Sequence, residues 1–381
     1  MSKAICYNKT YPIFSCDFMD GAIITKLYEV IDEKHMPIIL QNGNFNIKSV
    51  NEWLALRKIP ENREGLEEAR KRFRDFLNYS NMFSLSDQYW FQFTQKENWK
   101  KGNFFTNTYQ NETGKIFFAP WDVNEALVKK RNPDITTNGV LKKRWIQQEN
   151  EVSYLIKAGS RKYEQNPISE ILASMFLERL DIIPFVQYEL VVDNLKICSK
   201  CKNFIDADTE FVPVTQIYYK TDRDKEKGET VYEHLVKQSV AYGLNEEYVK
   251  HYLDAMITAD VILHNTDRHL NNFGYIRDVE SGRIISFAPL FDSGSAFSES
   301  KVKKTQDMFK DKRKRAVQKT LEPLSLESFS NEPMLQMVAA FPTLTRDEKK
   351  LIKQKIEQST EMIKRGGKKL KPREIIEDRF L

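Results

Sequence analysis

Short β-prone runs alternate with polar positions between residues 136 and 218, and this pattern predicts strands around one helix. The expected elements are a strand over 152–157, a helix over 168–180 and a hairpin over 186–192 and 195–200. Proline is tolerated in the first turn of a helix, so Asn166-Pro167 is a suitable start for the predicted helix.

After Pro213 the pattern becomes mainly helical. Residues 246–263 carry apolar side chains at helical spacing, which predicts a buried stripe formed by Leu253, Met256, Ile257 and Val261. The later part of the chain predicts a pair of short strands and two more helices, over 272–277, 283–288, 331–341 and 345–364. A strand-rich part followed by a helix-rich part is typical of a bilobal α+β fold.

The first third of the chain has the pattern of a folded module. A helix is expected over 64–78, with an apolar face formed by Leu66, Ala69, Phe73, Phe76 and Leu77. Residues 89–121 are rich in aromatic side chains, and because few basic residues lie among them, packing in a core is favoured over stacking on nucleic-acid bases. The expected domains are an N-terminal module over 1–125, a β-rich lobe over 126–212 and a helical lobe over 213–381.

The composition is that of an ordinary protein with a packed core. Of its 381 residues, 41% are hydrophobic and 30% are charged. The absence of a long apolar run and of a secretory leader predicts a cytoplasmic protein with no membrane segment.

The four cysteines of the chain are expected to be reduced thiols. Cys198 and Cys201 have the spacing of half a zinc site that Cys6 and Cys16 could complete, but two tight pairs would be usual, so thiols in a strand are favoured.

The net charge of +5 is concentrated near the C-terminus. Residues 301–319 hold nine basic side chains and two acidic ones, Asp307 and Asp311. One interpretation is a docking segment for an anionic partner, such as an acidic protein, tRNA or DNA. The other is a solvated loop, which is the more common role of such a run. The basic tract from Lys364 to Lys371 adds to the same charge.

Three polar residues form a pattern suited to phosphoryl transfer. Asp267 follows the predicted buried helix, Asn272 comes five residues later, and Asp292 lies after the two short strands. Phosphoryl transfer needs hard oxygen ligands for Mg²⁺ and a carboxylate that orients the acceptor hydroxyl. Asp and Asn are also common turn residues. The combination of these three residues with a lysine on a predicted strand upstream favours a catalytic role over a role as turn residues.

That lysine is Lys157, at the end of a predicted strand. A lysine on an inner strand can neutralise the phosphates of ATP, and Glu170 on the next helix is a suitable carboxylate to hold it. The alternative is that both are ordinary surface residues. Upstream lies the glycine loop (residues 136–143), in which Gly139 permits close backbone approach to a phosphate and Lys142 could add charge.

Taken together, these residues resemble the HipA-like serine/threonine kinases, toxin-type bacterial kinases of toxin–antitoxin systems. The resemblance covers residues 135–300 and rests on the glycine loop, Tyr154-Leu-Ile-Lys157, His264-Asn-Thr-Asp-Arg-His-Leu-Asn-Asn-Phe-Gly274 and Ala288-Pro-Leu-Phe-Asp-Ser-Gly-Ser295. It implies a bilobal protein-kinase-like fold with an extra N-terminal module.

The resemblance also implies roles for single residues. Asp267 would be the catalytic base, Asn272 and Asp292 would hold Mg²⁺, and Lys157 would bind the phosphates of ATP. His269 would shape the catalytic loop. The segment from Lys200 to Phe204, including Lys202, Asn203 and Phe204, would be the hinge that binds adenine.

Regulation and partners follow from the same resemblance. Thr136, or the adjacent Thr137, stands where family members autophosphorylate, and a phosphate there would compete with those of ATP. The acceptor would be a Ser or Thr hydroxyl of a protein, and an antitoxin partner is expected. Two alternatives stay open: a catalytically silent kinase-fold scaffold, and a kinase acting on a lipid or small molecule.

The N-terminal runs Ile59-Pro-x-x-Arg-Glu-Gly-Leu66 and Ser84-Leu-Ser-Asp-Gln-Tyr-Trp90 resemble those of HipA-domain proteins from Gram-positive gut bacteria. No chemical role is assigned to either run from the sequence.

Overall fold

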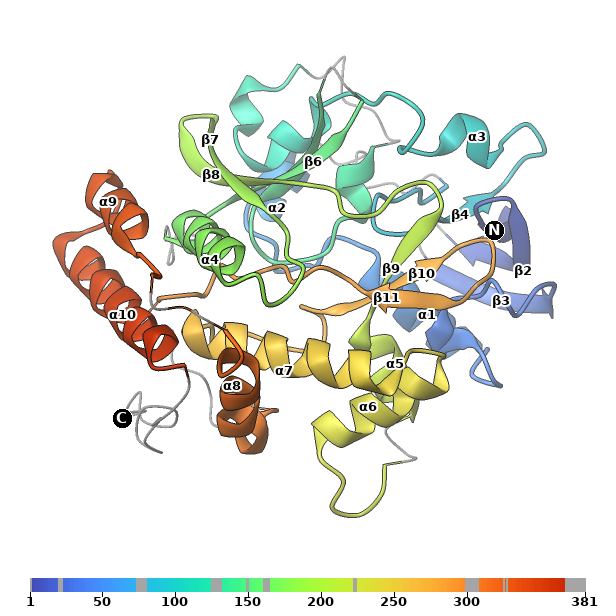
Figure 1. The fold of residues 1–381 in the computed structure, drawn as a ribbon. Coiled ribbons are helices and arrows are strands. Elements are labelled where there is room, and N and C mark those ends of the chain that lie inside the picture. Colours follow the sequence, from blue (N-terminus) through green and yellow to red (C-terminus); the bar gives the residue numbers. More distant parts are fainter. Residues whose placement is uncertain are drawn as a thin grey trace. The chain divides into compact units, whose positions relative to one another are not determined.

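The computed structural model divides into two compact units, and Figure 1 labels the helices and strands that form them. Unit 1 comprises Met1–Ser160, Val192–Val212 and Tyr275–Ser286, and unit 2 comprises Arg161–Val191, Pro213–Gly274 and Phe287–Leu381. The structure describes residues 2–19, 23–72, 81–124, 132–148, 151–159, 165–221, 225–298, 308–324, 326 and 328–366. The predicted domain boundaries after residues 125 and 212 stay predictions.

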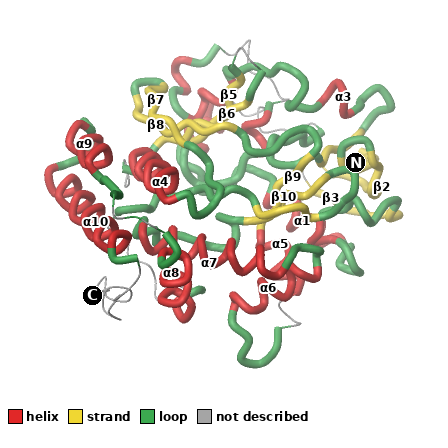
Figure 2. Tube along the Cα trace, in the orientation of Figure 1, coloured by secondary structure: helices red, strands yellow, loops and turns green. Residues whose placement is uncertain are grey.

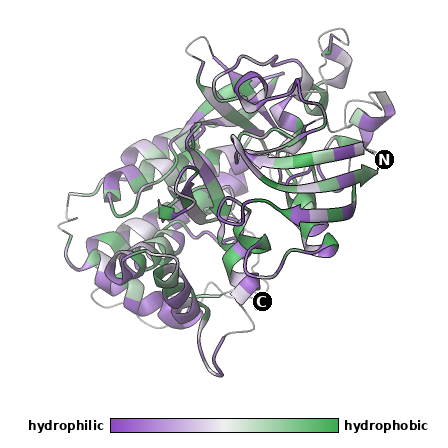
Figure 3. Cartoon of the chain, turned by 90° about the vertical axis from the view of Figure 1, so that its right-hand side faces the viewer, coloured by the Kyte–Doolittle hydropathy of each residue, from purple (hydrophilic) through white to green (hydrophobic). Residues whose placement is uncertain are grey.

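Unit 1 begins with an antiparallel sheet in the order β3-β2-β1-β4. Its strands are β1 (Ser2–Asn8), β2 (Tyr11–Met19), β3 (Ile23–Val30) and β4 (Tyr89–Gln92). Hydrophobic and hydrophilic residues alternate along the strands near the N-terminus (Figure 3), so one face of the sheet is buried. That face packs with Trp53 of helix α1 (Ile47–Leu56), which Asn46 caps.

Two further sheets follow. The first has the order β5-β6-β8-β7 and the second has the order β11-β10-β9. Their strands are β5 (Lys143–Gln147), β6 (Ser153–Ala158), β7 (Tyr188–Asp193), β8 (Lys196–Lys202), β9 (Thr209–Pro213), β10 (Gly274–Asp278) and β11 (Ile284–Phe287). Short helices connect them, namely α2 (Leu66–Arg72), α3 (Trp99–Gly102) and the 3-10 turns at Ile38–Leu40, Thr113–Phe117, Pro120–Asp122 and Pro133–Thr136.

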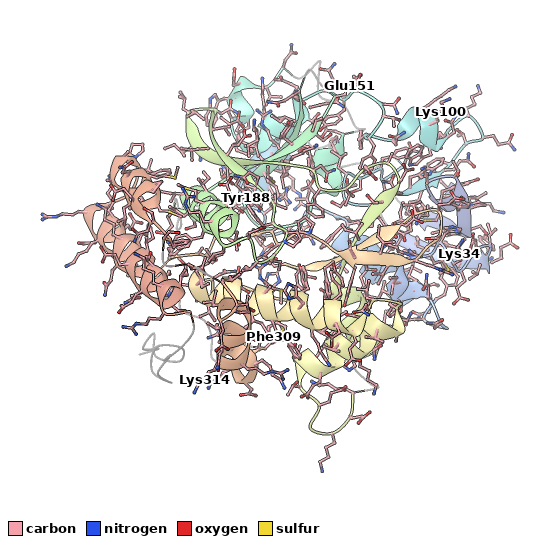
Figure 4. The ribbon with its side chains drawn as sticks, viewed as in Figure 1. Lys34, Lys100, Glu151, Tyr188, Phe309 and Lys314 are labelled. Atoms are coloured by element: carbon pink, nitrogen blue, oxygen red, sulfur yellow. The ribbon has the colours of Figure 1, made fainter. Side chains whose placement is uncertain are left out.

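A buried polar cluster joins β9 and β10 to the N-terminal sheet. Arg277 and Glu210, each about 1% exposed, form an ion pair at 2.8 Å. Arg277 also donates to the carbonyl oxygen of Met36 at 3.0 Å and to that of Lys34, which is labelled in Figure 4. Tyr89 on β4 donates to Glu210 at 3.0 Å. These bonds connect Tyr275–Ser286, the larger part of the β10–β11 hairpin, to the rest of unit 1.

Unit 2 is mainly helical (Figure 2). Its helices are α4 (Asn166–Leu180), α5 (Val214–Thr221), α6 (Val231–Ala241), α7 (Glu246–Ile262), α8 (Arg313–Leu321), α9 (Glu332–Ala340) and α10 (Arg346–Lys364), with a 3-10 turn at Lys310–Lys312. Helix α7 is buried along most of its length, and Ser359 of α10 donates a hydrogen bond to its Ile262 carbonyl at 2.5 Å. No helix in the described ranges is long and apolar enough to cross a membrane.

The α+β prediction is confirmed, and the predicted strands and helices after residue 152 lie close to the observed ones. The strands of residues 2–30 were not predicted. The aromatic run packs in the core as expected, except that Trp121 is 75% exposed. Of the helix predicted over 64–78, α2 forms the first part, and residues 73–78, with Phe73, Phe76 and Leu77, lie outside the described residues.

Asp134 is a buried carboxyl group in the 3-10 turn that precedes the glycine loop. Its Oδ1 accepts a hydrogen bond from the Trp145 amide at 2.6 Å, and a Cβ added at Gly114 would lie 2.6 Å from its Oδ2. Burial raises the pKa of Asp134 to about 7. Burial disfavours the charged form, so ionising this group costs stability.

Asp134→Asn should therefore change how stability depends on pH. Because the folded pKa is raised, wild-type stability falls as pH rises from about 4 to about 7. Asparagine keeps the acceptor and cannot ionise, so its stability relative to wild type should increase by on the order of 2 kcal/mol between pH 5 and pH 8. Urea denaturation at several pH values measures this. Asp311→Asn, at an exposed position, is the control, and parallel pH profiles for wild type and Asp134→Asn would refute the expectation.

Candidate catalytic site

The candidate site begins where helix α7 ends. His264 has a left-handed backbone (φ +49°), and its amide bonds to the Val261 carbonyl at 3.3 Å. The Asn265 amide bonds to the Asp260 carbonyl at 2.9 Å. This is the pattern of a Schellman helix end, in which glycine is usual and histidine is among the tolerated residues. The turn leads the chain from a buried helix directly into the polar loop 264–272.

A buried ion pair holds this loop. Arg268 donates through Nε to Asp260 Oδ2 and through Nη2 to Asp260 Oδ1, each at 3.0 Å, and its side chain is 5% exposed. Its Nη1 donates to the Asn272 carbonyl at 2.7 Å and to the Phe291 carbonyl at 2.8 Å. One guanidinium therefore connects helix α7, the polar loop 264–272 and the residue before Asp292.

The same pair orients Asp267. Asn265 donates from Nδ2 to Asp260 Oδ1 at 2.7 Å, and its Oδ1 accepts from the Asp267 amide at 3.3 Å. Asn272 donates from Nδ2 to the Asp267 carbonyl at 3.0 Å. The structure thus brings Asp267 and Asn272 together on one turn. Since Nδ2 of Asn272 is used within the loop, its side-chain oxygen is the atom suited to a cation.

Helix α5 supports the far end of the loop. The amides of Val214 and Thr215 donate to the carbonyls of Phe273 and Leu270 at 3.1 and 3.2 Å, and Thr215 Oγ1 donates to Asn271. Residues 270–273 are therefore held at the start of α5. Asp260, Asn265, Arg268 and Thr215 were not identified from the sequence, because their roles depend on contacts that spacing does not reveal.

Asp292 approaches from the segment after β11. It has a left-handed backbone (φ +59°), which Asp tolerates better than most residues. Its amide donates to the hydroxyl of Tyr188 at 3.2 Å, a residue labelled in Figure 4. The preceding Leu290 pairs with Phe185 in a parallel bridge, which fixes this segment against the chain that follows α4.

The electrostatics of the loop favour a proton acceptor. Asp267 is reached by solvent, but the protein removes part of its carboxyl group from water, and this desolvation raises its pKa. His269 lowers the pKa of Asp267, and the negative charge of Asp292 raises it. The effect of Asp292 shows that the two carboxyl groups are close enough to interact. Within the described ranges no group of three His, Cys, Asp or Glu side chains could hold a metal. The oxygens of Asp292 and Asn272 would thus need phosphate or water to complete a magnesium shell.

Lys157 lies in β6 and is buried, at 6% exposure. In the antiparallel register it stands opposite Lys143 of β5, so the two side chains share a face of the sheet. A Cβ added at Gly139 would lie 2.1 Å from Lys143 Nζ, whereas Lys142 packs beside Gly65. The structure therefore adds Lys143, which the sequence could not distinguish from Lys142 without the register.

The two threonines of the glycine loop are buried. Thr136 Oγ1 donates to the Phe83 carbonyl at 2.9 Å, and Thr137 Oγ1 donates to the Pro133 carbonyl at 2.9 Å. Thr137 Oγ1 also accepts from Trp145 Nε1 at 2.9 Å. Phosphorylation of either hydroxyl would require the loop to open.

The predicted hinge lies at the end of β8. The Asn203 amide donates to the Ser153 carbonyl at 2.9 Å, and its side chain donates to the Leu85 carbonyl at 3.0 Å. Phe204 packs edge-on against Phe211. Lys202 is exposed at the end of the strand. Adenine binding by Lys202, Asn203 and Phe204 stays a prediction.

Glu170 lies on α4 and is 2% exposed, which excludes an ordinary surface residue. Lys157 belongs to unit 1 and Glu170 to unit 2, and their pairing stays a prediction.

The four cysteines are free and buried, and Cys198 and Cys201 lie in β8 as expected of strand thiols.

Part of the basic segment forms helix α8. Lys312 pairs with Glu233 at 2.9 Å, and Lys319 pairs with Asp254 at 3.1 Å. Lys310, Lys314 (labelled in Figure 4) and Arg315 are exposed. Residues 301–307 and 367–371 lie outside the described residues, so an anionic partner for this segment stays a prediction.

No protein-family model matches the chain, and no curated protein sequence does. The solved structure of HipA from Shewanella oneidensis MR-1, in complex with HipB and operator DNA, is similar with a TM-score of 0.54 and 11% identity over 95% of this chain and 97% of that one. The Helicobacter pylori proinflammatory kinase CtkA is similar with a TM-score of 0.48 and 18% identity over 62% and 93%. The likeness to HipA shows that this chain has a HipA-like kinase fold.

Breaking the Asp260–Arg268 pair tests the frame of the site. Asp260→Asn leaves the buried Arg268 charge without a carboxylate, and the free energy of unfolding should fall by about 3–5 kcal/mol. Urea denaturation measures the change. Glu226→Gln removes a solvent-exposed pair with Lys237 and should leave stability unchanged. A loss no larger than that of the control would mean that Arg268 does not depend on Asp260.

Proposed function

We propose that this chain is a Mg²⁺- and ATP-dependent phosphotransferase that transfers the γ-phosphate of ATP to a Ser or Thr hydroxyl of a protein. The observation that carries the proposal is the turn that joins Asp267 to Asn272, held by Arg268 together with the segment of Asp292. Phosphoryl transfer is achieved mainly by positioning and charge stabilisation, and a rigid loop of this composition supplies both.

In this proposal Asp267 orients the acceptor hydroxyl and takes its proton. Its raised pKa makes it a better proton acceptor than an ordinary carboxylate. Asn272 and Asp292 would hold Mg²⁺, which when bound would neutralise the negative charge of the phosphates. His269 shapes the loop, since its ring nitrogen accepts from the Asn271 amide at 3.3 Å.

Lys157 and Lys143 would bind the phosphates of ATP. Both side chains lie on one face of the sheet, and the negative charge of a polyphosphate would be attracted to their ammonium groups. Glu170 would hold Lys157 in place. The hinge residues Lys202, Asn203 and Phe204 would contact adenine.

Partners and regulation are also proposals. The HipA structure contains HipB and operator DNA, and a comparable antitoxin is proposed for this chain. Autophosphorylation at Thr136 or Thr137 would first require their buried hydrogen bonds to break. The exposed basic residues of α8 favour an acidic region on whatever protein docks there.

Incubation with labelled Mg·ATP, alone and with cell extract, tests the activity. Asp267→Asn and Asp292→Asn should each reduce label transfer at least about 100-fold, since each removes a charge that the transition state requires. Asp181→Asn is the matched control, because Asp181 also has a left-handed backbone (φ +48°) but caps the exposed end of α4. No transfer by wild type would favour the scaffold alternative, and unchanged transfer by Asp267→Asn would contradict the role of Asp267 as the base.

The pH dependence of the reaction tests the role of Asp267. His269 lowers the pKa of Asp267, so His269→Gln should raise it. Activity requires the carboxylate, and the acid limb of kcat/KM should therefore move to higher pH in His269→Gln. A pH–rate series for both proteins measures the shift. An acid limb that stays in place, or moves to lower pH, would contradict this role.

A further inference from the structure

The segment 59–66 of the N-terminal run contacts the glycine loop directly. Arg63 donates through Nε to the Gly139 carbonyl at 2.8 Å and through Nη2 to the Thr137 carbonyl. The Glu64 amide donates to the Val140 carbonyl at 2.9 Å. Three carbonyl groups of one short loop thus point towards one segment, which we name the strut (residues 59–66).

The strut is itself well fixed. Arg63 is 3% exposed, and its guanidinium lies 5.7 Å from the centre of the Phe117 ring. Its amide donates to the Pro60 carbonyl at 3.0 Å, and its carbonyl accepts from Leu66 at 3.1 Å. Gly65 has φ +84°, and an added Cβ would lie 3.0 Å from the Phe117 carbonyl oxygen. Glycine is therefore needed for this close approach.

The strut determines where the loop amides point. A trans peptide places its carbonyl and the next N–H on opposite sides, and the described chain has no cis peptide bond. With the carbonyls of Thr137, Gly139 and Val140 bound to the strut, the amides of the three following residues point away from it. These residues are Asn138, Val140 and Leu141, and among the described residues none of these amides donates a hydrogen bond.

A set of outward N–H groups in a short loop is a binding site for an anion. Two positive charges reinforce it. The Arg63 guanidinium lies behind the carbonyls, and Lys143 Nζ lies next to Gly139. Each bound carbonyl also polarises its peptide, which makes the N–H of the same peptide a stronger donor.

We propose that Arg63 is a positioning residue for nucleotide phosphate: by holding the carbonyls of the glycine loop, it presents the amides of Asn138, Val140 and Leu141 to the phosphates. This role rests on the proposed function, since it takes the ligand to be ATP. Arg63 acts through the loop and does not touch the nucleotide. The N-terminal module thereby contributes to nucleotide affinity, although it supplies no ligand of its own.

The test compares ATP with adenosine, because only ATP carries the phosphates. Affinities are measured by titration calorimetry for wild type, Arg63→Ala, Arg63→Lys and the control Arg70→Ala, which removes an exposed pair with Glu61. Arg63→Ala should weaken ATP binding at least about ten-fold, the size expected from losing charge-assisted hydrogen bonds. Arg63→Lys, which can still donate to one carbonyl, should lose less. Adenosine affinity and the Arg70→Ala values should not change.

Hydrogen exchange without nucleotide provides a second measurement. The amide of Glu64, which donates to the Val140 carbonyl, and the amide of Thr137, which donates to the Asp134 carbonyl, should exchange faster in Arg63→Lys than in wild type or Arg70→Ala, because the loop is less restrained. If Arg63→Ala does not fold, Arg63→Lys decides the result. Equal ATP affinity in wild type and Arg63→Lys, or a parallel loss of ATP and adenosine affinity, would overturn the positioning role alone. Failure of wild type to bind ATP would overturn the proposed function as well.

Discussion

The Asp260–Arg268 ion pair is the interaction on which the candidate site depends. Both residues are nearly buried, and desolvating two charges costs about as much as their attraction returns. The pair is therefore better explained by geometry than by net stability. The Arg268 guanidinium donates to the carbonyls of Asn272 and Phe291. The Asp260 carboxylate accepts from the side chain of Asn265, which in turn accepts from the Asp267 amide. A neutral pair would lack the five donors that a guanidinium provides in a fixed plane.

Backbone strain accompanies this frame at two positions. His264 and Asp292 both have positive φ, a conformation that costs energy for residues other than glycine. His264 ends helix α7, and Asp292 follows the strand pair that leads back to the loop. Strained residues persist only where the surrounding structure holds them, and they concentrate at functional sites. Here the Schellman bonds hold His264, and the Tyr188 hydroxyl holds Asp292.

The sequence predicted the local features of the site and missed those that depend on distant contacts. Asp267 and Asn272 are five residues apart, so one turn brings them together, and the sequence could identify them once Asp292 and Lys157 were considered with them. Lys143 differs from Lys142 only by strand register, which sets the face of the sheet that a side chain occupies. The strands of residues 2–30 include Pro12 and several charged residues, which weaken a strand pattern until the sheet partners are known.

Arg63 is the clearest case of information that the sequence does not display. It is 76 residues from Gly139, and an arginine in a polar run resembles any surface arginine. Its role comes from burial, since a guanidinium removed from water must satisfy its donors with protein acceptors. Loop carbonyls are suitable acceptors, and occupying them leaves the opposite side of each peptide as a donor. A cation buried behind a loop thus creates an anion site in front of it. The proposed role shows how a residue far from the glycine loop in the sequence can affect the chemistry of that loop.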